Sequence, residues 1–286
     1  GLAVIGWAAL APPVFAAPPA GPGWEPLFAG EDLSHWKLPP GGDVGDNGDF
    51  MDLVFRVAPD GSRVIYHADR DTEGVQELYS VPVEGPATAT IKLNPSLVAG
   101  GEIGLFLGYV IEVSPDSRRV VYMADQDIED VYEIFSVPVA GPPGEAVKLN
   151  GVLVPDGRIR TLQITPDSSR VVYVADQLQA NVDELFSVPI EGPASAGTKL
   201  NKTLSNGDVH GFRVSPDSAR VVYRADQDIS DVDELYSVSI AGPASEGVRL
   251  NKPLVGGQDV QPFARITADS QRVVYVADQT FDETFE

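Results

Sequence analysis

The chain has 286 residues, of which 43% are hydrophobic and 22% are charged, a composition typical of a folded globular protein. Its 42 acidic and 20 basic residues give a net charge of −22, which argues against nucleic acid as a partner and suits a cationic one. The absence of cysteine excludes disulfides, thiolate nucleophiles and cysteine-based zinc sites.

The first segment, residues 1–16, has the pattern of a signal peptide remnant. It is apolar and uncharged, and small residues around Ala16 resemble a cleavage site. The segment is too short and too rich in proline to span a membrane, and no later stretch reaches that length. A disordered Ala/Pro tail is the alternative interpretation. We expect a linker over residues 17–25 and a periplasmic or secreted protein without a membrane span.

From residue 51 onwards one sequence unit recurs five times, at intervals of about 50 residues. The copies cover residues 51–94, 107–150, 160–201, 210–251 and 260–286. Each copy has a Pro-Asp turn (Ala-Asp in the fifth), whose aspartates are Asp60, Asp116, Asp167, Asp217 and Asp269. Each also has a tyrosine in a run of β-branched residues, namely Tyr66, Tyr122, Tyr173, Tyr223 and Tyr275.

Each of the first four copies contains four strand-like pieces. In the third copy they are residues 162–164, 170–174, 184–188 and 198–200, rich in β-branched and aromatic residues and separated by Pro, Asp, Ser and Gly. Four short strands in a repeat of this length are typical of one propeller blade. The sequence therefore predicts an all-β protein, a β-propeller of about five four-stranded blades over residues 26–286.

The recurring residues have a structural interpretation. We expect the tyrosine to be core in every blade, because a blade packs both faces against its neighbours. We expect the turn aspartate to pair with the arginine that follows it, locally or across blades, as with Asp167 and Arg170.

The fifth copy supplies only two strands, near residues 263–266 and 272–276. Residues 26–38 carry two strand-like pieces that match the missing ones, so we expect them to close the last blade and protect its edge. The rival hypothesis is an open arc of a longer six- or seven-bladed protein.

The strings Ser-Pro-Asp-Ser-x-Arg-Val-Val-Tyr, Ala-Asp-Gln-Asp and Asp-Glu-Leu-Tyr/Phe-Ser-Val resemble the WD40-like PD40 repeats of TolB-type propellers over about residues 51–286. Related blades occur in the propeller domains of prolyl oligopeptidases. The sequence departs from the family where serine replaces a frequent glycine, at Ser117, Ser168, Ser218 and Ser270. The resemblance implies a non-enzymatic, protein-binding scaffold in the cell envelope. Residues 27–36 also resemble the opening of sugar-acting jelly-roll domains of the 3-keto-disaccharide hydrolase type.

The acidic loops after the tyrosine strands are candidate Ca²⁺ sites, because carboxylate oxygens are ligands that Ca²⁺ prefers. The candidates are Asp125, Asp127, Asp226 and Asp228. The alternative is that the first Asp of each loop bonds backbone N–H groups of its own turn, since it recurs in all five copies. We favour the alternative and expect no cofactor.

The strand before each Pro-Asp turn carries one polar residue near the expected central channel. These residues are Arg56, Glu112, Gln163, Arg213 and Arg265. Three arginines in so acidic a chain are candidates for binding an anionic ligand. The alternative is that they pair between blades.

Motifs for catalysis are missing from the sequence. The three histidines, His35, His67 and His210, have no metal-ligand spacing, and no nucleophile elbow or phosphate loop occurs. We therefore expect an exported scaffold that binds a protein partner. The alternatives are the propeller portion of an exported peptidase or carbohydrate-active enzyme, and a propeller that binds an ion or an anionic ligand in its channel.

Overall fold

The computed structural model describes residues 55–104, 111–204, 207–254, 257–262 and 264–278. The signal remnant, the linker and the expected closing strands (1–16, 17–25 and 26–38) lie outside the described residues. In the described part of the chain, no helix is long and apolar enough to cross a membrane.

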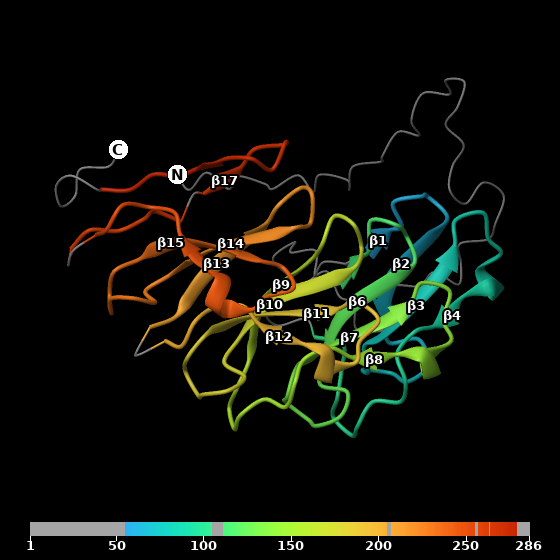
Figure 1. Ribbon diagram of the computed structural model, residues 1–286. Coiled ribbons are helices and arrows are strands. Elements are labelled where there is room, and N and C mark those ends of the chain that lie inside the picture. Colours follow the sequence, from blue (N-terminus) through green and yellow to red (C-terminus); the bar gives the residue numbers. More distant parts are fainter. Residues whose placement is uncertain (1–54, 105–110, 205–206, 255–256, 263, 279–286) are drawn as a thin grey trace, which may run out of the picture. The chain divides into compact units, whose positions relative to one another are not determined.

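Four of the sequence repeats form four-stranded antiparallel sheets in which each strand pairs with the next along the chain, and each sheet is one blade (Figure 1). The first and second blades contain β1 (Phe55–Val57), β2 (Arg63–Ala68), β3 (Glu77–Pro82), β4 (Ile91–Lys92), β5 (Ile111–Val113), β6 (Arg119–Ala124), β7 (Glu133–Pro138) and β8 (Val147–Lys148). The third and fourth contain β9 (Ile159–Ile164), β10 (Arg170–Ala175), β11 (Glu184–Pro189), β12 (Thr198–Lys199), β13 (Val209–Val214), β14 (Arg220–Ala225), β15 (Glu234–Ser239) and β16 (Val248–Arg249).

The fifth repeat forms a two-stranded sheet of β17 (Arg265–Ile266) and β18 (Val273–Val274). In each of the four full blades, one short 3₁₀ helix stands between the third and fourth strands. These helices are η2 (Ala87–Ala89), η3 (Pro143–Glu145), η4 (Ala194–Ala196) and η5 (Ala244–Glu246). The predicted all-β propeller is confirmed, as sheets of this size repeated along the chain define that fold.

The core lies between consecutive blades. One cluster combines Val121 and Ile134 of the second blade with Ile164 and Tyr173 of the third, and the other clusters join the remaining neighbours in the same way. In the second, third and fourth blades, the β-branched residues of the second strand therefore pack on both faces. Burial of this apolar surface is the main force that stacks one blade on the next.

The recurring tyrosine is fully buried in the three middle blades. Tyr122, Tyr173 and Tyr223 have at most 1% of their surface exposed, whereas Tyr66 and Tyr275 are partly exposed. The expectation of a core tyrosine in every blade is therefore wrong for the first and fifth. The physical reason is that, among the described residues, the first and fifth sheets have a neighbouring blade on one side only.

The buried tyrosine hydroxyls share one pattern of hydrogen bonds. Tyr122 donates to Oε1 of Gln126 over 2.9 Å, and the third and fourth blades repeat this bond with their own glutamines. Each ring also stacks on the aromatic residue opposite it in the third strand, as Tyr122 does on Phe135 with 5.5 Å between ring centroids. The tyrosine therefore ties the second strand to the third strand and to the acidic loop.

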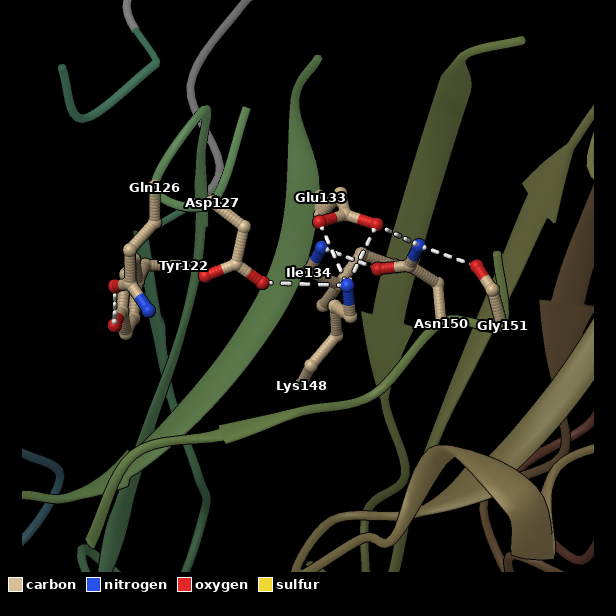
Figure 2. A network of polar contacts seen from close by, with 8 residues as sticks. All are labelled: Tyr122, Gln126, Asp127, Glu133, Ile134, Lys148, Asn150 and Gly151. Carbon is tan, nitrogen blue, oxygen red and sulfur yellow. Dashed lines mark hydrogen bonds and ion pairs between the residues drawn. The ribbon is translucent and has the colours of Figure 1, made fainter. Parts of the chain in front are cut away.

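A polar network fixes the short fourth strand of each blade, and Figure 2 shows it in the second. Nζ of Lys148 lies 2.9 Å from Oε2 of the buried Glu133. Oδ1 of Asn150 accepts the backbone N–H of Ile134 over 2.7 Å, and its amide donates to the carbonyl of Gly151. The same Glu, cation and Asn recur in the other three full blades. A buried carboxylate is tolerated here because it is paired and hydrogen-bonded.

The Pro-Asp turns differ from the expectation that aspartate pairs with arginine. Oδ1 of Asp167 accepts the backbone N–H of Ser169, within its own turn, whereas Nε of Arg170 donates to Oγ of Ser187 on the next strand. The other full blades repeat the arginine–serine bond. The pairing hypothesis is corrected, because each partner finds a nearer group. Hydrogen bonds within the turn, from Ser62 first, hold the pKa of Asp60 below its usual value.

The serines that replace glycine have a role between blades. Ser168 adopts a φ of 63°, in the left-handed region, and its Oγ accepts the backbone N–H of Asp116 in the preceding blade over 3.0 Å. Ser117, Ser218 and Ser270 repeat this geometry. Glycine would relieve the backbone strain but would leave the neighbour's N–H without its acceptor.

Candidate functional site

The first aspartate of each acidic loop bonds backbone N–H groups. Oδ1 of Asp125 accepts the N–H of Glu102 over 2.5 Å, and its Oδ2 accepts the N–H of Asp130 over 3.0 Å. Asp176 and Asp226 make the same two bonds in their own blades. This aspartate therefore joins the loop after the second strand to the connection that enters the blade.

In the second and fourth blades, the second aspartate of the acidic loop lies beside a cation of the fourth strand. Oδ2 of Asp127 is 3.3 Å from Nζ of Lys148, and Oδ2 of Asp228 is 3.9 Å from Nη1 of Arg249. Within the described ranges, the carboxylates of Asp127 and Asp228 do not converge with those of Asp125 or Asp226 on a common ligand position.

The five expected channel residues have different surroundings. Nη1 of Arg56 and of Arg265 each donate to the carbonyl of the residue before them, and both side chains are exposed. Glu112 accepts the backbone N–H of Ile164 in the next blade over 3.2 Å. Burial raises the pKa of the Glu112 carboxyl, against this hydrogen bond and the charge of Arg56, which lower it. Glu112 thus follows the alternative of pairing between blades.

Gln163 and Arg213 line a pocket of about 540 Å³. The pocket lies along the first strands of the third and fourth blades, and Gln261 and Pro262 of the fifth repeat complete its wall. His210 and Arg224 also line it. The structure therefore brings two of the five expected residues together and adds a histidine and an arginine to them.

The fourth blade departs from the repeat beside this pocket. Nε2 of His210 lies 3.2 Å from Oδ1 of Asp233 and 3.5 Å from Oδ1 of Asp226. Arg224 forms an ion pair with the other oxygen of Asp233. Burial lowers the pKa of the Arg224 guanidinium, and the charges of Asp259 and Asp226 oppose that shift. Among the described residues, His210, Asp226 and Asp233 form the group whose imidazole and carboxylate ligand atoms all lie within 4.8 Å of one another.

Motifs along the chain assign no role to His210. It stands at the second residue of β13, where β9 has Arg160, and its partners come from the loop after the second strand. An alignment of the repeats contains the signal, because the histidine occurs in one copy only. Spacing along the chain does not show it, since the ligand atoms meet through the pairing of β13 with β14.

Comparison with known proteins bears on the fold. No protein family profile matches the chain, and no curated protein is similar to it in sequence. The structure of prolyl oligopeptidase B from Galerina marginata superposes with a TM-score of 0.50 at 14% identity, over 79% of this chain. The chain is a β-propeller.

Two TolB structures are also similar to the propeller. One is from Agrobacterium tumefaciens, with a TM-score of 0.43 and 16% identity over 79% of this chain and 69% of that one. The other is from Acinetobacter baumannii, with a TM-score of 0.39 and 14% identity over 80% of this chain and 51% of that one. The propeller spans 34% of the peptidase's length. At these identities the likeness concerns the fold alone.

Proposed function

We propose that this chain is an exported β-propeller that binds a protein partner in the cell envelope or outside the cell and does no chemistry of its own. The observation that carries the proposal is that the recurring polar side chains form their hydrogen bonds within the propeller. In each full blade that the structure describes, the glutamate, asparagine, arginine and first aspartate bond to the blade itself. These groups maintain the scaffold and leave recognition to the loop tips and the pocket.

The tips of three consecutive acidic loops expose large apolar side chains. Ile128, Leu178 and Ile229 are 59%, 58% and 42% exposed, and all three lie between the second and third strands of their blades. A single exposed apolar residue is normal on any protein. The same exposure at one end of three neighbouring blades, amid carboxylates, supports a partner that offers apolar and cationic side chains.

Crosslinking from a loop tip tests this proposal. A photoreactive amino acid at Ile229 should give a discrete adduct with one protein in the native host. Val248, a 51% exposed residue on the outermost strand of the same blade, is the matched control and should give none. The same adduct from both positions, or none from Ile229, would contradict the proposal.

Two further experiments test the rest of the proposal. Fractionation of the host tests export. Turnover of ester, peptide or glycoside substrates by the purified protein would contradict the proposal that the chain catalyses no reaction.

The pocket favours a second candidate, the binding of a small anionic ligand. Arg213 and Arg224 bring cationic groups to one concave surface, together with the amide of Gln163. In thermal melts with a panel of small carboxylates, a stabilising compound should lose its effect in Arg213→Gln and keep it in the control Arg56→Gln. Equal loss in both variants would contradict binding in this pocket.

A further inference from the structure

His210 replaces a fixed cation of the neighbouring blade. In the third blade, Nε of Arg160 lies 2.9 Å from Oδ1 of Asp183 and forms an ion pair with it. In the fourth blade, the corresponding residues are His210 and Asp233. The guanidinium is always charged, whereas a neutral imidazole offers a nitrogen lone pair. The exchange therefore turns a cation donor into a metal-binding donor beside two carboxylates.

One oxygen of Asp233 faces His210. This Oδ1 is buried, receives no hydrogen bond from the rest of the described chain, and lies 3.2 Å from Nε2 of His210, while Oδ2 pairs with Arg224. When the imidazole is neutral and its Nε2 carries the lone pair, two acceptors face each other at this distance, an arrangement that a cation between them relieves. Arg224 holds the carboxylate so that this oxygen faces His210, which is the role of a positioning residue around a metal site.

The distances fit two edges of a small coordination sphere. Ligands at about 2.0–2.1 Å from a tetrahedral zinc ion are separated by roughly 3.3 Å. Nε2 of His210 lies 3.2 and 3.5 Å from the two carboxylate oxygens. Oδ1 of Asp226 also accepts the N–H of Asp208, which fixes its direction and leaves a second lone pair.

We propose that His210, Asp226 and Asp233 bind a divalent transition-metal ion of the zinc class. One imidazole and two carboxylates suit zinc better than calcium, which takes oxygen ligands alone. Two carboxylates, one guanidinium (Arg224) and a neutral imidazole together carry one negative charge before the ion binds. His210 and Arg224 line the pocket, so the remaining coordination position is accessible to a water or to a ligand in the pocket. The metal site is independent of the protein partner proposed above.

Titration of the metal-stripped full chain with Zn²⁺ tests the proposal. We expect one bound ion for the wild-type chain, measured by isothermal calorimetry and by dialysis with metal analysis. His210→Arg, which copies the third blade, should lose that ion while keeping the circular dichroism spectrum. Asp233→Asn should also lose it. His35→Ala, a histidine outside the described residues, should retain it at unchanged affinity.

A variant that should gain a Zn²⁺ ion provides a sharper test. Arg160→His places an imidazole beside Asp176 and Asp183, so this variant should bind a second Zn²⁺, and the double variant with His210→Arg should bind one. Co²⁺ should give d–d absorption that His210→Arg abolishes. No Zn²⁺ bound by the wild-type chain would overturn the proposal and leave His210 as a hydrogen-bond donor to the aspartates. An ion that survives in His210→Arg, or that His35→Ala removes, would overturn it equally.

Discussion

The two ends of the blades differ in how strictly they keep the repeat. At the Pro-Asp end, the aspartate of every described turn accepts the backbone N–H two residues further on. Serines such as Ser168 join the second to fifth repeats each to the blade before it. At the acidic end, the position of Asp233 is occupied by Tyr132 in the second blade, and that of His210 by Arg160 in the third. Repetition therefore marks the groups that hold the fold together, and a departure in one blade marks a candidate site.

The largest effect should come from the repeated core. Tyr173→Ala removes a buried ring stacked on Phe186 and should lower the free energy of unfolding by about 3–5 kcal/mol in denaturant melts. Tyr66→Ala is the matched control in the first blade, where the ring is partly exposed, and its cost should be smaller. A loss below about 1 kcal/mol for Tyr173→Ala would contradict its packing.

A second test concerns the polar network of the fourth strand. Asn150→Ala leaves the buried N–H of Ile134 without its acceptor and should cost about 1–3 kcal/mol in the same melts. Asn201→Ala removes the equivalent acceptor of Leu185 in the third blade and should cost a similar amount. Widely different costs for the two variants would show that hydrogen bonds of the same geometry contribute differently to the free energy of unfolding in the two blades.

The sequence predicted the framework and missed the site for one physical reason. A residue such as Tyr173 is recognised from its spacing, because one local pattern of strands and turns recurs in every copy. The expected pairing of Arg170 is wrong, because Asp167 is near it along the chain while Ser187 lies beside it across the sheet. His210 and Asp233 are separated by a full hairpin, so their approach depends on strand register, which spacing alone does not reveal.

The bond between blades at the Pro-Asp end should give a smaller effect. Ser168→Ala removes the acceptor of the Asp116 N–H and keeps the strained φ of 63°, so it should cost about 1–2 kcal/mol. Ser168→Gly removes the same acceptor but relieves the strain, so it should cost about 1 kcal/mol less than the alanine variant. Equal melting for the two variants would show that the left-handed backbone carries no strain here.

The smallest effect, a change near zero, is expected from calcium at the acidic end. Asp127 lies beside Lys148, and among the described residues its carboxylate does not converge with that of Asp125, so the loop offers no convergent set of carboxylate oxygens. Millimolar Ca²⁺ should therefore leave the melting temperature unchanged, and Asp127→Asn should behave like the wild-type chain. A rise of several degrees that a chelator reverses would contradict this, because an ion that binds only the folded state must stabilise it.

Zn²⁺ in the same experiment distinguishes the repeated acidic loop from the departure at His210. It should raise the melting temperature of the wild-type chain through the fourth blade and fail to do so in His210→Arg, since the arginine supplies a fixed cation to the same aspartates.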